Sequence, residues 1–135
     1  GAGCYDITGP CAEVALMGYG NARQIGGGLH QRLRSRAFVV ADRERPRERV
    51  VLVTADLWAC TQAVKIEVCR QLQKVFGGIY SEANVLISGT HTHSAPAGFS
   101  WHAFYNLVSR GFNPQNFETI VGGIVQSISL AHGNL

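Results

Sequence analysis

Two histidines, His91 and His93, have the residue type and the spacing best suited to chemistry in this sequence. They follow a short apolar run at residues 85–88, and Gly89 lets the backbone turn between the run and the pair. If the run is a buried strand, the alternation of side chains places both imidazoles on one face beyond its end. Two such imidazoles can hold one metal ion, or one metal ion and one substrate oxygen. A lone histidine is usually an ordinary surface or core residue, but this pair favours a metal or catalytic role.

Two strands are predicted upstream of the histidines, at residues 35–42 and 50–55, from their content of β-branched and apolar residues. The short charged loop between them predicts a hairpin. Asp56 follows the second strand directly. Its carboxylate either faces the same cleft as His91 or caps the following segment, and the sequence leaves both alternatives open.

The clearest predicted helix covers residues 61–76, where apolar residues recur at helical spacing (Val64, Val68, Leu72 and Val75). With the strands at 50–55 and 84–88 it forms a strand–helix–strand unit, which predicts a right-handed parallel crossover. A last helix is predicted to begin at residues 113–114, and His132 near its end is expected to place positive charge at the helix C-terminus. The predicted fold class is α/β, a mixed β-sheet flanked by helices.

The remaining segments give weaker signals. Residues 12–28 are glycine-rich and predicted to be irregular, and no Lys-Ser/Thr follows the glycines, so a phosphate loop is not expected. Three interpretations of this segment stay open: its glycines allow close backbone packing, it is a plain flexible loop, or it forms a carbonyl-lined cation site near His30. Residues 99–108 predict a short helix whose aromatic side chains line an apolar pocket beside the metal or, for at least half of them, belong to the core.

The four cysteines do not predict a disulfide framework. Cys60 and Cys69 are too far apart along one helix to be bridged, and buried free thiols are expected there. Cys4 and Cys11 remain able to meet across a turn.

Composition limits the classes of protein. At 135 residues, with 46% hydrophobic and 16% charged residues, the chain is one domain or part of one and can bury a core. A net charge of +3 is too small to indicate nucleic acid but is compatible with an anionic membrane surface. No apolar run is as long as a membrane span, and no signal-peptide pattern opens the chain. Because the sequence lacks an initiator Met, we expect a fragment or a processed form.

Several pieces of the sequence together carry a family resemblance: Asp6-Ile7-Thr8-Gly9-Pro10, Leu16-Met17-Gly18-Tyr19-Gly20, Arg34-Ser35-Arg36-Ala37-Phe38, Ser88-Gly89-Thr90-His91-Thr92-His93-Ser94, Gly111-Phe112 and residues 128–135. They resemble the N-terminal part of the catalytic domain of the neutral ceramidases, zinc-dependent amidases that cleave ceramide into sphingosine and a fatty acid. The resemblance implies that residues 1–135 are an incomplete N-terminal portion of a larger zinc-hydrolase domain.

The resemblance also implies roles for single residues. His91 corresponds to a zinc ligand, and His93 corresponds to a residue that faces the substrate and helps hold the reacting carbonyl or transition-state oxygen. His30 corresponds to a residue whose main-chain carbonyl helps hold Ca²⁺. Ala95 departs from the family pattern, where a glycine is expected. The family's other ligands (a His, a Glu and a Tyr) and its essential Ser lie further downstream and have no counterpart here.

Since a catalytic zinc usually needs three protein ligands, we expect this chain alone to be inactive and to associate through exposed apolar edges. The implied partners are ceramide, a membrane surface and the remainder of the catalytic domain beyond residue 135, with no nucleic acid. The implied location is extracellular or on the cell surface. Two alternatives stay open: another zinc amidohydrolase acting on a small amide, or a non-catalytic lipid-binding or interaction fragment.

Overall fold

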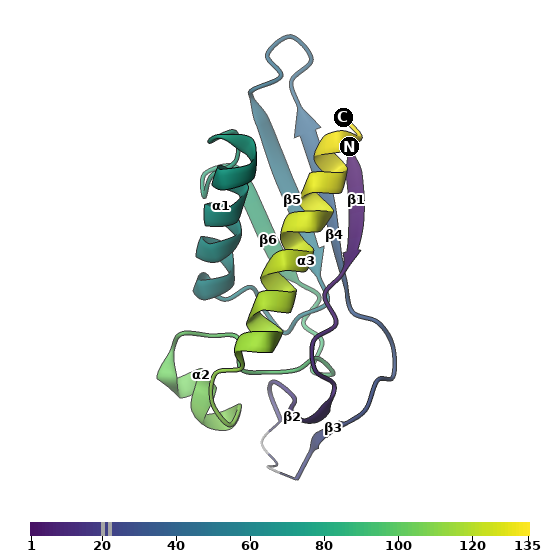
Figure 1. The fold of residues 1–135 in the computed structure, drawn as a ribbon, viewed down its shortest axis with the longest axis vertical. Coiled ribbons are helices and arrows are strands. Elements are labelled where there is room, and N and C mark those ends of the chain that lie inside the picture. Colours follow the sequence, from purple (N-terminus) through teal and green to yellow (C-terminus); the bar gives the residue numbers. More distant parts are fainter. Residues whose placement is uncertain (20, 22) are drawn as a thin grey trace.

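A computed structural model describes residues 1–19, 21 and 23–135. Gly20 and Ala22 lie outside the described residues, and Gly20 belongs both to the glycine-rich segment and to one of the pieces that carry the family resemblance. Figure 1 shows the elements in chain order, which are β1 (Ala2–Asp6), β2 (Ala12–Ala15), β3 (Ile25–Gly27), β4 (Arg34–Ala41), β5 (Arg49–Ala55), α1 (Gln62–Phe76), β6 (Val85–Gly89), α2 (Ala103–Val108) and α3 (Pro114–Gly133).

The main sheet has the strand order β1-β4-β5-β6. Strands β4 and β5 form the predicted antiparallel hairpin, with Phe38 opposite Leu52. Strand β6 runs parallel to β5, as predicted, with Leu86 beside Leu52, and α1 connects the two strands. Strand β1 adds to the other edge, antiparallel to β4. The mixed sheet with flanking helices confirms the predicted fold class.

Helices α1 and α3 lie together on one face of this sheet, as Figure 1 shows. The core between them consists of the strand residues that point to this face and the apolar stripes of the two helices (Val39, Val51, Val53, Val64, Val68, Leu72, Ile120, Ile124 and Ile128 among others). Asn113 caps α3, and its side chain accepts a hydrogen bond from the Asn116 N–H. Val75 was wrongly predicted to be in the stripe of α1. It is 61% exposed because it points away from the sheet.

The opposite face of the sheet carries apolar side chains without cover from the described residues. Phe38, Val40, Val50, Leu52 and Leu86 are between 45% and 62% exposed, and the strand pairing makes them neighbours. We call these five residues the open sheet face. Strands that are apolar on both sides are typical of a sheet that is buried on both sides.

At the lower end of the view in Figure 1, β2 and β3 pair into a small antiparallel ladder below the main sheet. The prediction that residues 12–28 are irregular is therefore wrong for these two strands. Helix α2 confirms the expected short helix. The expectation that at least half of the aromatic side chains in residues 99–108 belong to the core is wrong, because Phe99 is buried, Tyr105 is half-buried, and Trp101 and Phe104 are exposed. Among the described residues, no helix is both long and apolar enough to span a membrane.

His132 does not have its predicted role as a helix C-terminal charge. The Tyr80 hydroxyl lies 2.7 Å from His132 Nδ1, and the Arg49 guanidinium lies 3.3 Å from the same nitrogen. Burial and the neighbouring Arg49 charge lower the pKa of His132. The ring is therefore held neutral, in a small polar cluster that joins the end of α3 to the start of β5.

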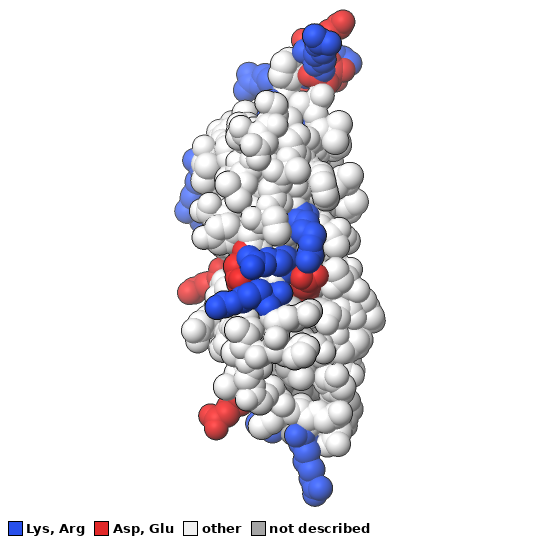
Figure 2. Space-filling model, turned by 90° about the vertical axis from the view of Figure 1, so that its right-hand side faces the viewer, with Lys and Arg blue, Asp and Glu red and all other residues white. Residues whose placement is uncertain are grey.

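The acidic residues at the strand ends belong to ion pairs with arginines. Asp56 accepts a hydrogen bond from the Arg34 N–H and pairs with Arg36 at 3.0 Å, and Asp6 pairs with Arg34 at 3.5 Å and Arg32 at 3.9 Å. Figure 2 shows basic and acidic side chains gathered midway along one side of the molecule. Both predicted alternatives for Asp56 are wrong, because its carboxylate turns to β4 instead of the His91 side or the following segment.

All four cysteines are free thiols. The expectation of free thiols at Cys60 and Cys69 is therefore confirmed, and Cys4 and Cys11 do not meet. Burial raises the pKa of Cys60 to about 11, so its nucleophilic thiolate form is disfavoured.

Candidate functional site

After β6 the chain runs beside the end of β5 and the residues just beyond it. Thr90 N–H donates to the Ala55 carbonyl at 2.9 Å, and His91 N–H donates to the Leu57 carbonyl at 3.0 Å. His91 has a φ of +65°, an uncommon backbone conformation for a residue with a side chain. The strand alternation therefore ends at Gly89, and the predicted reason for the pairing of His91 and His93 is wrong.

The predicted meeting of the two histidines is confirmed by another route. The ring centroids of His91 and His93 are 5.0 Å apart, and the ring planes are tilted by 77°. The left-handed turn at His91 folds the segment so that both rings face the same space. His91 is exposed, while His93 is half-buried. The arrangement leaves one ring open to a ligand and holds the other against the protein.

His93 is held by a single backbone oxygen. His93 Nδ1 lies 2.9 Å from the Met17 carbonyl oxygen. A carbonyl only accepts, so Nδ1 carries the proton, and in the neutral ring Nε2 carries the lone pair. A neutral His93 therefore offers an acceptor at Nε2. The predicted donation of a hydrogen bond from His93 to a substrate oxygen requires a ring that is protonated at both nitrogens.

The chain on either side of this hydrogen bond is paired backbone to backbone. Met17 N–H donates to the Ala95 carbonyl at 3.4 Å, Ala97 N–H donates to the Ala15 carbonyl at 2.9 Å, and Leu16 forms a bridge with Pro96. Ala95, which replaces the expected glycine, is 1% exposed, and its carbonyl takes part in this pairing. The segment after the histidines thus lies directly on the segment that follows β2.

Helix α3 holds the same loop from the other side. The buried Asn116 side chain donates from Nδ2 to the carbonyls of Pro96 at 3.0 Å and Ala97 at 2.9 Å. These hydrogen bonds satisfy two carbonyls inside the protein, where an unpaired carbonyl would be costly. Position 116, at the first turn of α3, therefore fixes the course of the histidine loop.

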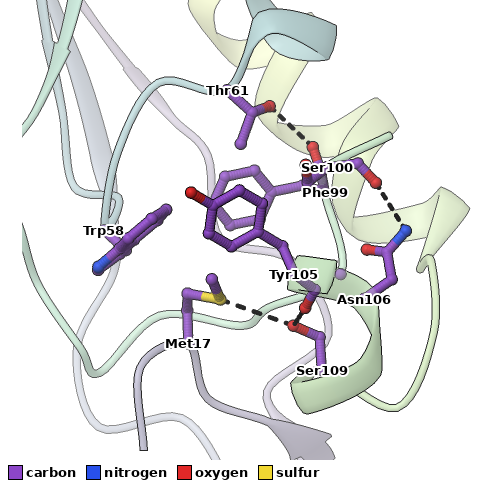
Figure 3. Close-up of a pocket in the computed structure, with 9 residues that line it drawn as sticks. Met17, Trp58, Thr61, Phe99, Ser100, Tyr105, Asn106 and Ser109 are labelled. Atoms are coloured by element: carbon purple, nitrogen blue, oxygen red, sulfur yellow. Dashed lines mark hydrogen bonds between the residues drawn. The ribbon is translucent and has the colours of Figure 1, made fainter. Parts of the chain in front are cut away.

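A narrow pocket near His91 is lined by three aromatic side chains together with Met17 and small or polar residues. Trp58 lies between His91 and Tyr105, with ring centroid distances of 6.1 Å and 5.5 Å. Figure 3 shows the rings of Trp58 and Tyr105 beside the Met17 side chain, with Phe99 behind them. Phe99 and Tyr105, from the predicted segment 99–108, supply part of the wall of this cavity, whose volume of about 10 Å³ is room for about one water molecule. The predicted apolar pocket beside the metal stays a prediction.

Three residues of the site were missed by sequence reasoning. Trp58 lies three residues beyond the carboxyl end of β5, a position that often faces a site in α/β folds. Its position after the predicted strand could therefore have identified it. Met17 and Tyr19, whose ring is 6.3 Å from the His93 ring, come from the glycine-rich segment. Nothing in their local pattern connects them with a residue more than seventy positions away.

His30 lines a different pocket from the aromatic one near His91. It is exposed and lines an open pocket of about 420 Å³ together with the glycines of β3, Thr92 and Ser94. Calcium takes six to eight oxygen ligands, usually including carboxylates. No Asp or Glu is among the described residues that line this pocket, so this chain supplies at most carbonyl and hydroxyl ligands there.

The histidine pair is likewise an incomplete metal centre. Within the described part of the chain, no group of three or more His, Cys, Asp or Glu residues is arranged to hold a metal ion. Two imidazoles suit zinc, but they fall short of the usual three protein ligands of a catalytic zinc. The donor chemistry therefore fits zinc only if further ligands come from outside residues 1–135.

Two solved structures that share this architecture are described as ceramidases. The neutral ceramidase of Pseudomonas aeruginosa matches with a TM-score of 0.95 and 44% identity, over 98% of this chain and 21% of that chain. A structure described as "Ceramidase complexed with C2" matches with a TM-score of 0.94 and 45% identity, over 98% of this chain and 20% of that chain. At this level of identity the likeness extends beyond the fold alone, to a class of hydrolases.

The family model for "Neutral/alkaline non-lysosomal ceramidase, N-terminal" matches residues 1–135, and this chain belongs to that family. Neutral ceramidase B of Dictyostelium discoideum is 56% identical over 133 residues, which are 98% of this chain and 18% of that protein. The neutral ceramidase of Mycobacterium tuberculosis is 45% identical over 136 residues, covering all of this chain and 21% of that protein. The chain thus spans about a fifth of the length of these relatives.

Proposed function

We propose that the full-length protein containing this chain is a zinc-dependent amide hydrolase that cleaves ceramide into sphingosine and a fatty acid. The observation that carries the proposal is the His91–His93 pair, with ring centroids 5.0 Å apart, in a chain that belongs to the neutral ceramidase family. The relatives are named neutral ceramidases, which supports ceramide as the substrate.

In this proposal His91 is a zinc ligand and His93 faces the substrate. Zinc, when bound, polarises the scissile carbonyl and supplies an activated water near neutral pH. His93, protonated at both ring nitrogens, donates from Nε2 to the oxygen that gains negative charge, while Nδ1 stays on the Met17 carbonyl. Trp58 packs against the His91 ring and limits the access of water from that side.

We also propose that the rest of the catalytic domain completes this chain. It would supply the further metal ligands, including those of a calcium site at the His30 carbonyl, and it would cover the open sheet face. The support is that the relatives are about five times longer, and that five apolar side chains there remain half exposed. Alone, the chain would be inactive and would self-associate. Because ceramide resides in membranes, we place the enzyme at a membrane surface, outside the cell or on its surface.

The activity is tested with the full-length protein by measuring the release of sphingosine and fatty acid from long-chain and short-chain N-acylsphingosines, and from small soluble amides. His91→Ala should remove both activity and bound zinc as measured by metal analysis. His93→Ala should keep its zinc and lose about 10²–10³-fold in turnover. His102→Ala is the matched control, since His102 is exposed and its side chain makes no capping hydrogen bond.

Each outcome separates the alternatives. Normal zinc content in His91→Ala would refute the ligand role, and loss of zinc in His93→Ala would make both histidines ligands. A preference for small soluble amides would favour another zinc amidohydrolase. Absence of any amide hydrolysis would favour a non-catalytic lipid-binding or interaction protein.

A separate experiment tests whether the rest of the domain covers the open sheet face. It compares two exposed apolar residues. Leu52, 45% exposed, lies on the open sheet face, and Val75, 61% exposed, lies on the outer side of α1. If the rest of the domain covers the sheet, Leu52→Gln destabilises the full-length protein by about 2 kcal/mol, while Val75→Gln stays within about 0.5 kcal/mol. Equal small effects on thermal unfolding would show that the open sheet face is not covered.

A further inference from the structure

We infer that the backbone at Met17 and Gly18 is the positioning element for His93, fixing both the place of its ring and which ring nitrogen faces the substrate. The inference rests on the proposed function for the role of His93. The positioning itself stands on contacts within this chain. Both residues lie in the glycine-rich segment, to which no catalytic role was attached by sequence.

The first contact sets which way round the ring lies. The Met17 carbonyl lies 2.9 Å from His93 Nδ1 and accepts a hydrogen bond from its N–H. Rotating the ring by half a turn would place a carbon at that position and leave the carbonyl without its partner. The hydrogen bond therefore leaves Nε2 as the ring nitrogen that is available to a ligand, in a ring whose centroid lies 5.0 Å from that of His91.

The second contact sets the space available to the ring. A Cβ added at Gly18 would lie 2.0 Å from His93 Nδ1 and 2.3 Å from His93 Cε1, far inside van der Waals contact. The backbone at Gly18 also has a φ of +93°, which side chains with a Cβ rarely adopt. The ring thus lies flush against a position where only glycine leaves room for it.

Met17 is itself held on two sides, so its carbonyl is a fixed point. Its N–H donates to the Ala95 carbonyl at 3.4 Å, and its buried side chain has the Ser109 hydroxyl 3.6 Å from Sδ. Figure 3 shows this contact between Met17 and the end of the α2 segment. His93 is therefore positioned by a piece of chain that is held both by the segment after the histidines and by the end of α2.

The test is Gly18→Ala in the full-length protein. The added methyl should push the His93 ring out of place, lowering kcat by about 100-fold with a smaller change in KM and with zinc content unchanged. The matched control is Gly78→Ala. Gly78 has nearly the same φ, +86°, but a Cβ there meets nothing within 4 Å, and it lies beyond the end of α1, away from the site. The control should keep its activity and lose only a little melting temperature.

A double-mutant cycle gives a readout that does not depend on ceramide hydrolysis. In the His93→Ala background the clash disappears, so Gly18→Ala should lower the melting temperature there no more than Gly78→Ala does. In the wild-type background Gly18→Ala should lower it clearly more. Failure of Gly18→Ala to fold, with recovery in the double variant, also supports the inference.

Two results would overturn it. If Gly18→Ala lowers the melting temperature equally in both backgrounds, or prevents folding in both, Gly18 does not act through the His93 ring. If Gly18→Ala retains wild-type kcat, the place of the ring is not set there. Should the wild-type protein not hydrolyse ceramide, the proposed function fails while the cycle still decides the positioning.

Discussion

Gly122 and Gly123 are neighbours in α3, and alanine is expected to have opposite effects on stability at the two positions. A Cβ at Gly122 meets nothing within 4 Å, whereas a Cβ at Gly123 would lie 2.4 Å from the Asp6 carbonyl oxygen and 2.5 Å from Ile7 Cγ2. Alanine in a helix interior is favoured over glycine by about 0.5–1 kcal/mol. Gly122→Ala should therefore stabilise the protein by about that amount.

Gly123→Ala gains the same helix propensity but forces α3 away from the chain at the end of β1. Overpacking a tight core typically costs about 1–3 kcal/mol, and a backbone oxygen cannot turn aside as a flexible side chain can. We expect a net loss of about 2 kcal/mol. The two variants, which differ by one position along the same helix, should therefore be separated by about 3 kcal/mol.

Hydrogen exchange of the amides in α3 measures this difference directly in the full-length protein. A separation of about 3 kcal/mol in opening free energy corresponds to roughly a 100-fold difference in protection between the two variants. Equal protection, or stabilisation by both alanines, would refute the close approach of α3 to the end of β1. A loss of protection in Gly122→Ala would show that Gly122, and not only Gly123, lies on the face of α3 that packs against the chain.

Three further predictions follow from buried polar groups and thiols. Asn116→Ala leaves the Pro96 and Ala97 carbonyls without their donor, so the melting temperature should fall by an amount that corresponds to about 2 kcal/mol, and protease cleavage near residues 92–98 should increase. Because burial and then Arg49 lower the pKa of His132 in the folded protein, folding favours the neutral ring. That stability is complete above the ordinary pKa near 6.5 and is lost as the pH falls through the lowered value, so melting temperatures between pH 7 and pH 5 should fall less in His132→Gln than in the wild type. Since burial raises the pKa of Cys60 to about 11, a thiol reagent at pH 8 should modify the exposed Cys4 long before Cys60, as peptide mass spectrometry would show.

The elements with strong periodicity were predictable from the sequence, and those defined by distant partners were not. The hairpin of β4 and β5 and helix α1 follow from local pattern alone. Strands β2 and β3 are short and glycine-containing, and they become strands only by pairing with each other across an intervening loop. Val75 matched the helical spacing but lies beyond the width of the face that the sheet covers.

Side-chain partners were the least predictable part. Asp56 satisfied the local expectation of a carboxylate at a strand end, yet its partners are the Arg34 N–H and the Arg36 guanidinium. The choice among nearby donors depends on the register between β4 and β5, which the sequence does not state. The same is true of His132, whose neighbours Tyr80 and Arg49 come from elements far away in the chain.

The sequence predicted that His91 and His93 lie together, but the reason given for it, strand alternation, is wrong. Strand alternation would hold His91 and His93 by the sheet alone. The observed loop is held instead by the backbone hydrogen bonds of Thr90 to Ala55 and of His91 to Leu57, and by the hydrogen bond of the His93 ring to the Met17 carbonyl. Backbone contacts leave side-chain identity largely free at the positions that make them.

Around the histidines, side-chain identity is restricted at Asn116, which donates to two loop carbonyls, and where another chain segment approaches too closely for a Cβ. A Cβ at Gly89 would lie 2.7 Å from the Leu57 carbonyl oxygen, and a Cβ at Gly18 would lie 2.0 Å from the His93 ring. Thr90, by contrast, is exposed, and only its main chain is used. The geometry of the histidine pair thus depends on two glycines on opposite sides of it. Substitutions at these glycines should move the rings even though neither residue offers a group to a metal or a substrate.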